Sequence, residues 1–94
     1  MILTFADKHT EELFTYGRTR RYPTEIAKRA LLKLITLDSV EALEELRVPP
    51  GNRLEALSGD RSGQHSIRIN RQWRICFEWR EDGIHNVEIN NHYA

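Results

Sequence analysis

The chain has 94 residues with a formal net charge of zero, and 39% of its residues are hydrophobic and 30% charged. This length predicts one domain, residues 1–94, and this composition is typical of a globular protein rather than a disordered one. Charged residues interrupt every apolar stretch and the N-terminus lacks the features of a signal peptide, so we expect neither a membrane span nor export.

The first third of the chain is expected to form a short strand and a short helix. Ile2–Phe5 is an apolar run that suits an edge strand. Asp7 is a preferred N-cap residue, which predicts a helix from there through Thr15. Gly17 ends this helix, and the arginine-rich segment 18–22 is expected to form a basic connecting loop.

A longer helix is expected next, from Thr24 to about Leu37, because apolar residues recur there at helical spacing. Pro23 suits its first turn. Asp38 and Glu41 have the spacing of a capping box, which predicts a further short helix. Its inner face would consist of Val40, Leu43 and Leu46, and the run Pro-Pro-Gly-Asn at 49–52 ends the helical part.

The pattern changes from helical to alternating after this loop, which predicts an antiparallel sheet. Residues 53–57 form a first strand, followed by a turn over 58–63. The next two strands meet the same core only if Ile69 lies opposite Trp73 and Ile67 opposite Ile75, which requires a three-residue loop over 70–72. In the last hairpin, placing Ile75 opposite Ile89 and Phe77 opposite Val87 requires the loop 81–83, with Gly83 in the left-handed region.

This register places charged residues together on the open face of the sheet. Arg68 falls opposite Arg74, Arg74 falls opposite Asn90, and His92 is a diagonal neighbour of Arg74. Like charges directly opposite each other destabilise a sheet, so an anion is expected nearby. Two interpretations remain open at this point: compensation by the acids Glu78 and Glu88 of the same face, or a bound phosphate.

The C-terminal residues add groups that can move protons. The imidazole of His92 and the phenol of Tyr93, beside an arginine pair, resemble the parts needed for RNA cleavage: a base, cations for the phosphorane charge, and an acid. Glu55 is a further candidate. His65 lies on the core side of its strand and is expected to pack rather than react.

Other chemistries fit poorly. The histidines lack the spacing of zinc ligands, no glycine-rich phosphate loop precedes a helix, and the single cysteine, Cys76, has no partner. A lone cysteine also favours the reducing cytoplasm.

The segment from Gly51 to Trp79 resembles the signature of HigB-type toxins of the RelE/ParE superfamily. The distinctive pieces are Leu-x-x-Leu-x-Gly-Asp-Arg, Ser-Ile-Arg, Trp-Arg-Ile-x-Phe, and a final strand that ends in a short His/Tyr motif. The Met-Ile start, the two helices and the length extend the resemblance over nearly the whole chain.

The resemblance implies an α+β fold in which N-terminal helices pack on a twisted antiparallel sheet, as in microbial ribonucleases. It implies a toxin that enters the ribosomal A site and cleaves translated mRNA, without a metal or organic cofactor. The implied partner is a HigA-type antitoxin with a helix-turn-helix DNA-binding domain. Toxin and antitoxin together would repress their own promoter, so the toxin would reach operator DNA through the antitoxin.

By position, Arg74 matches the sheet arginine that contacts the scissile phosphate in this family, and His92 and Tyr93 fall in its catalytic C-terminal segment. Many members end in Asp-Tyr-His where this chain has Asn91-His92-Tyr93, and some have histidine where it has Glu55. Glu55 is accordingly a candidate base or a residue that orients an arginine. The candidate RNA-binding residues are Arg53, Arg61, Arg68, Arg71 and Asn90.

Two other functions share this fold. A ParE-like toxin poisons DNA gyrase without RNA chemistry, and a non-enzymatic homologue would only bind a DNA-binding partner. The grouping of Arg74, His92 and Tyr93 favours the ribonuclease, because a gyrase binder has no need for it. Fold alone does not choose among the three.

Overall fold

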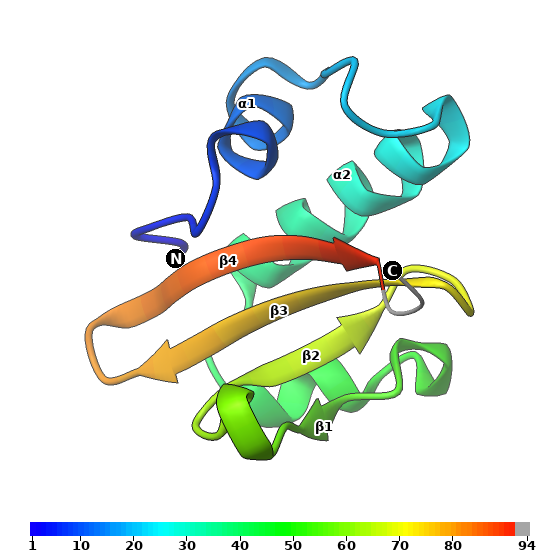
Figure 1. Ribbon diagram of the computed structural model, residues 1–94. Helices are drawn as coiled ribbons and strands as arrows, with labels where there is room; N and C mark the ends of the chain where they lie inside the picture. The colour runs from blue at the N-terminus through cyan, green and yellow to red at the C-terminus, as the bar shows by residue number, and fades with distance from the viewer. Residues whose placement is uncertain (92–94) are drawn as a thin grey trace.

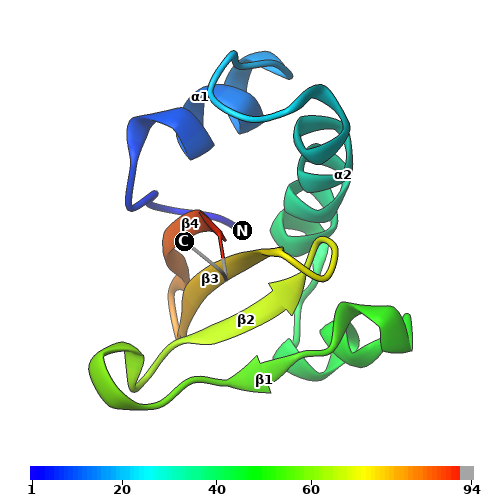
Figure 2. The ribbon, with the colours of Figure 1, turned by 45° about the vertical axis from the view of Figure 1, so that its right-hand side comes forward.

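The computed structural model describes residues 1–91, so residues 92–94 lie outside the description. Two helices pack on one face of a four-stranded antiparallel sheet of order β1-β2-β3-β4. Figure 1 shows α2 behind this sheet, and in the turned view of Figure 2 α2 stands to the right, with α1 above β4 in both views. The predicted α+β architecture is confirmed. The helices are α1 (Lys8–Tyr16) and α2 (Thr24–Ser39), and the strands are β1 (Glu55–Ala56), β2 (His65–Arg68), β3 (Trp73–Arg80) and β4 (Gly83–Asn91).

The predicted cap of α1 is confirmed. An Asp7 carboxylate oxygen accepts a hydrogen bond from the Thr10 amide at 2.7 Å, and Gly17 ends the helix in the left-handed region at φ 78°. The hydroxyl of the buried Thr10 also accepts a hydrogen bond from the Ile89 amide at 3.1 Å. The aspartate cap satisfies a free amide of the first turn, and Thr10 carries that network on to β4.

The predicted capping box at Asp38 is wrong. Asp38 lies within α2, and its carboxylate accepts a hydrogen bond from the Ile2 amide at 2.8 Å. Glu45 instead binds the amides of Glu41 and Ala42, at the start of a short 3-10 helix over Leu43–Arg47. A residue far away in the sequence thus binds the aspartate that a local pattern had assigned to a cap.

The segment Ile2–Phe5 makes only isolated parallel bridges to β4 instead of the expected edge strand. These bridges join Ile2 to Ile84 and Phe5 to Val87. Between the two partners on β4, Asn86 has a φ of 53°, and its amide donates to the Thr4 hydroxyl at 2.8 Å. This irregularity prevents a continuous ladder, although the segment still covers the outer edge of β4.

The β2–β3 hairpin has the predicted register. Ile67 pairs with Ile75, Arg68 pairs with Arg74, and the Ile69 amide donates to the Trp73 carbonyl at 2.9 Å. The loop therefore spans residues 70–72, as the side-chain alternation requires. By contrast, the expected first strand over 53–57 shrinks to the two residues of β1, because the chain turns at Arg53, where φ is 45°.

The β3–β4 hairpin differs from the prediction at its turn. Ile75 pairs with Ile89 and Arg74 with Asn90 as expected, but Arg80 pairs with Gly83, so the turn has two residues rather than three. The register shifts between Cys76 and Glu78, where Phe77 faces two residues of β4, Asn86 and Val87. Such a bulge adds one residue to a strand. It lets Ile84 and Val87, three positions apart, both point into the core.

One hydrophobic cluster lies between the helices and the sheet. His65 packs against it as predicted, with its ring stacked 6.2 Å from that of Phe77. Trp73 and Trp79 are partly buried against the same cluster, which leaves the opposite face of the sheet open. The buried members of the cluster are Leu13, Ala30, Leu34, Leu37, Leu46, Ile67, Ile69, Ile75, Phe77, Ile84, Val87 and Ile89.

Gly83→Ala is expected to lower the free energy of unfolding by about 2 kcal/mol or more. Gly83 has a φ of 148°, and an added Cβ would lie 2.8 Å from the Leu3 side chain and 2.9 Å from the Met1 carbonyl. Urea unfolding followed by tryptophan fluorescence measures the change. Gly51→Ala is the matched control, because no atom lies within 4 Å of its added Cβ; equal stability of both variants would contradict this account.

Candidate RNA-cleavage site

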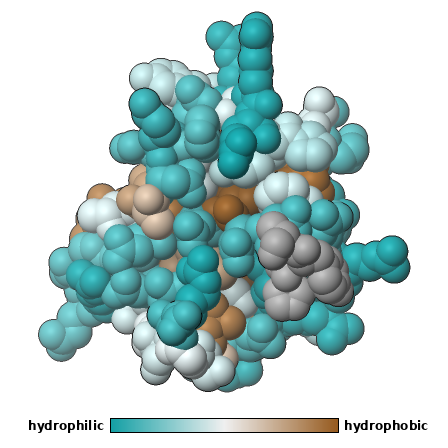
Figure 3. Space-filling model, viewed as in Figure 1, coloured by the Kyte–Doolittle hydropathy of each residue, from teal (hydrophilic) through white to brown (hydrophobic). Residues whose placement is uncertain are grey.

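Two rows of side chains cross the open face of the sheet. In the first row, Ser66 lies opposite both Glu55 and Cys76, and Cys76 lies opposite Glu88. In the second row, Arg74 lies between Arg68 and Asn90. Hydrophilic side chains cover most of this side of the molecule (Figure 3). The open face therefore presents polar and charged groups directly above the apolar core.

The guanidinium of Arg74 is held by three neighbours. Its Nε donates to the Ser66 hydroxyl at 2.7 Å, and Nη2 donates to the Arg53 carbonyl at 2.8 Å. The Glu55 carboxylate lies 3.8 Å from the same Nη2. Only 13% of the Arg74 side chain is exposed, so this arginine is a fixed, partly desolvated cation. The positive φ of Arg53 is what turns its carbonyl toward Arg74.

The acids expected to compensate the arginine pair bind other partners. Glu88 pairs with Arg61 at 2.7 Å, and Glu78 pairs with Arg80 at 2.6 Å. Glu55 is the acid beside Arg74 instead. Within residues 1–91 the guanidinium of Arg68 makes no hydrogen bond or ion pair. The positive charge of the Arg68–Arg74 pair is therefore only partly offset by the described part of the protein.

A hollow of about 340 Å³ opens beside Arg74. It brings together four of the predicted site residues, Glu55, Arg61, Arg74 and Asn90. Arg53 contributes only its carbonyl to the site, and its side chain is exposed. Neither Arg68 nor Arg71 lines the hollow, and His92 and Tyr93 lie outside the described residues. The full lining is Glu55, Leu57, Ser58, Asp60, Arg61, Ser66, Arg74, Cys76 and Asn90.

Arg61 reaches over the sheet from the β1–β2 connection to Glu88 on β4. Its hydrogen bond to this carboxylate raises the pKa of the Arg61 guanidinium, which fixes it as a cation. Cys76 lines the same hollow and is 2% exposed, and burial raises the pKa of its thiol. Arg61, held by Glu88, thus lines the hollow as a fixed cation beside the neutral thiol of Cys76.

Sequence reasoning missed Ser66, which holds the Nε of Arg74. The predicted register contained the signal, because it placed Ser66 on the same face as Arg74, two pairs further along the strands. Because Ser66 accepts from Nε and the Arg53 carbonyl accepts from Nη2, the Nη1 edge of the Arg74 guanidinium stays available for a ligand. Arg74 can therefore offer a cationic edge to an anion, with the Glu55 carboxylate 3.8 Å from its Nη2.

Neither a metal centre nor a membrane span is found in the described part of the chain. Within residues 1–91, no three His, Cys, Asp or Glu side chains are grouped closely enough to hold a metal ion. Neither α1 nor α2 has the length and apolarity needed to cross a bilayer.

Comparisons with known proteins identify the family of the chain. Residues 3–93 match the family model described as the RelE-like toxin of type II toxin-antitoxin system HigB. The chain belongs to the HigB family of toxins. It is 38% identical to Toxin HigB-1 of Vibrio cholerae serotype O1, over 98% of both chains. It is also 33% identical to Endoribonuclease HigB of Proteus vulgaris, over 84% of this chain and 85% of that protein.

Solved structures place the fold of this HigB-family chain among RelE-like toxins. The YoeB-YefM complex of Staphylococcus aureus contains a chain with a TM-score of 0.63 at 20% identity, and the match covers 99% of both chains. YafQ of E. coli gives a TM-score of 0.59 at 10% identity, over 99% of this chain and 96% of YafQ. As a type II toxin, this HigB-family chain has an antitoxin as its partner.

Proposed function

We propose that this chain is a ribosome-dependent endoribonuclease that cleaves translated mRNA, with Arg74 holding the scissile phosphate. The observation that carries the proposal is the fixed, partly desolvated guanidinium of Arg74 above an open polar hollow. A preorganised cation stabilises the negative charge that develops on the non-bridging phosphate oxygens, without reorganising during the reaction. The name of the Proteus vulgaris relative, Endoribonuclease HigB, supports the same chemistry.

In this proposal the remaining site residues divide into two groups. The first group transfers protons. The 2′-hydroxyl of the RNA attacks the adjacent phosphorus, so one side chain must accept its proton and another must protonate the leaving 5′-oxygen. His92, Tyr93 and Glu55 are the candidates for these two transfers. Arg68, Arg61, Arg53, Arg71 and Asn90 are proposed to bind the flanking RNA.

The proposed partners follow from the same function. The antitoxin is of the HigA type, with a helix-turn-helix domain that binds operator DNA, and the toxin reaches this DNA only through the antitoxin. The target is the ribosomal A site with its mRNA, so we expect the protein in the cytoplasm. A gene for a helix-turn-helix protein of about a hundred residues next to the toxin gene, a length typical of one small domain, would support the pairing.

Expression of the chain tests the proposed reaction. Growth arrest accompanied by cuts within translated mRNA, mapped at their 5′ ends and absent when translation initiation is blocked, is the expected result. Purified mRNA without ribosomes should remain intact. DNA breaks with intact mRNA would instead select the gyrase-poisoning alternative. If neither mRNA nor DNA is cut, the remaining alternative is a non-enzymatic partner of the antitoxin.

Glu55→Gln separates the two roles considered for Glu55. If this carboxylate accepts the proton of the 2′-hydroxyl, the turnover rate falls by about 10²-fold or more. If Glu55 only helps to orient Arg74, the amide retains most of the activity, because the main hydrogen bonds of Arg74 go to Ser66 and the Arg53 carbonyl. Single-turnover cleavage on programmed ribosomes distinguishes the two outcomes by the size of the loss in rate.

A further inference from the structure

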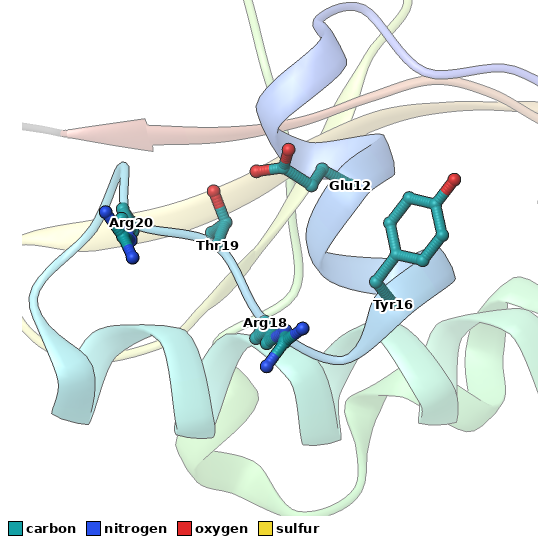
Figure 4. Close-up of a pocket in the computed structure, with 5 residues that line it drawn as sticks. All are labelled: Glu12, Tyr16, Arg18, Thr19 and Arg20. Atoms are coloured by element: carbon teal, nitrogen blue, oxygen red, sulfur yellow. The ribbon is translucent and has the colours of Figure 1, made fainter.

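A second hollow lies away from the open face of the sheet, between the end of α1 and the loop that leads to α2. Its volume is about 780 Å³, and Glu12, Tyr16, Arg18, Thr19 and Arg20 line it. Figure 4 shows Glu12 and Tyr16 projecting from α1, and the other three residues from the loop. This is the basic loop that the sequence singled out and that the cleavage site does not use.

Two arginines of this loop, Arg18 and Arg20, have no partner within residues 1–91. No hydrogen bond or ion pair within residues 1–91 involves the guanidinium of Arg18 or Arg20, and Glu12, the one acid of the hollow, pairs with neither. Tyr16 is 74% exposed. Two unpaired arginines beside an exposed aromatic ring fit a phosphate backbone with a neighbouring base or sugar, because guanidinium groups bind phosphate in a fork and rings stack on bases.

The loop is anchored at the end of the sheet that carries Arg74. Tyr22, the last residue before Pro23, packs its ring edge-on at 5.7 Å from the ring of Trp73, which precedes Arg74 on β3. Thr10 contacts the Tyr22 hydroxyl at 3.4 Å, and burial raises the pKa of this phenol. Arg71, in the exposed β2–β3 loop, lies two residues before Trp73. Basic side chains therefore continue from the cleavage face around this end of the sheet.

We propose that the hollow formed by Arg18, Arg20 and Tyr16 is a second RNA-binding site, which holds the phosphate backbone of ribosomal RNA while the open face holds the mRNA. The inference rests on the proposed function, since it assumes action on the ribosome. An RNA ligand fits this hollow because two guanidinium groups with no partner in residues 1–91 lie beside an exposed ring, and Glu12 is the one acid among the lining residues. In this proposal the open face already holds the mRNA, so we assign the second hollow to ribosomal RNA, the other RNA that surrounds a protein bound to the ribosome.

The double variant Arg18→Gln/Arg20→Gln tests the site through binding and cleavage. Both side chains project from a loop outside the hydrophobic cluster, so folding should be unaffected. Affinity is measured on ribosomes programmed with an mRNA whose 2′-hydroxyls are methylated, which prevents cleavage, over a series of salt concentrations. We expect roughly tenfold weaker binding, and a plot of log affinity against log salt that is shallower by about 0.7 to 0.9 for each phosphate that the variant no longer neutralises.

The matched control is Arg47→Gln/Arg80→Gln, which removes the same charge from two exposed arginines that already pair with Glu44 and Glu78. With cleavable mRNA, the loop variant should raise KM while kcat stays within about twofold, because the site binds substrate and transition state equally. An unchanged affinity and salt slope relative to the control would overturn the proposal. So would a drop in antitoxin affinity with ribosome binding intact, which would assign the loop to the antitoxin. Failure of the wild-type chain to cut mRNA would instead refute the proposed function itself.

Discussion

Arg74→Ala is expected to reduce the rate of mRNA cleavage by about 10²- to 10³-fold and to relieve toxicity, because it removes the fixed cation at the centre of the open face. Single-turnover cleavage on programmed ribosomes measures the change. Arg74→Lys should recover only part of the rate, since an ammonium keeps the charge but cannot donate to the Ser66 hydroxyl, the Arg53 carbonyl and a phosphate in the geometry of the planar fork.

The control for Arg74→Ala is Arg80→Ala, on the same strand at its other end. Arg80 pairs with Glu78 and is half exposed, so its removal should change neither cleavage nor growth arrest. Circular dichroism and a cooperative thermal transition would show that both variants fold. A folded Arg74→Ala variant that retains full toxicity would refute the assignment of the scissile phosphate to this face.

Ser66→Ala is expected to lower kcat by about tenfold, roughly the worth of one hydrogen bond to a charged group, while KM changes little. Ser66 is fully buried and its hydroxyl accepts from Arg74 Nε at 2.7 Å, so the substitution frees the guanidinium to rotate away from the hollow. Ser66 would then be a positioning residue that acts through Arg74, without touching the RNA. Ser66→Thr retains the hydroxyl and should restore most of the rate.

A double-mutant cycle separates this role from a general effect on folding. If Ser66 acts through Arg74, Ser66→Ala should have almost no further effect on cleavage in the Arg74→Ala background. A purely structural role would reduce cleavage by a similar factor in both backgrounds. Equal reductions with and without Arg74 would therefore reject the positioning role, as would a Ser66→Thr variant as inactive as Ser66→Ala.

Side-chain alternation is sufficient to predict most of the sheet. The pairing of Ile67 with Ile75, and of Ile75 with Ile89, determines which residues share the open face, so the Arg68–Arg74–Asn90 row was predictable. The turn of the last hairpin was not, because a left-handed Asn86 adds a residue to β4 and compensates for a shorter turn. Two regular patterns, a three-residue turn and a bulged strand with a two-residue turn, give the same register at Ile75.

The cleavage site was predictable only where it depends on register. Ion pairs such as Arg61 with Glu88 join residues from different parts of the chain, and no local spacing encodes them. The same applies to the Arg53 carbonyl, which reaches Arg74 because Arg53 adopts a positive φ that arginine rarely takes. Asp38 illustrates the converse error. Its spacing to Glu41 fits a capping box, but it lies in the last turn of α2, where its carboxylate binds the Ile2 amide.

The N-terminal segment along β4 also affects how the free protein behaves. Strand edges with unpaired amides and carbonyls recruit further strands and so promote aggregation. Here the amides of Leu3 and Ala6 bind the carbonyls of Ile84 and Val87, which occupies the outer edge of β4. The opposite edge, β1, is only two residues long. In the described part of the chain, the sheet therefore offers no long edge for stacking copies, which favours a toxin that persists as a separate molecule once its antitoxin is gone.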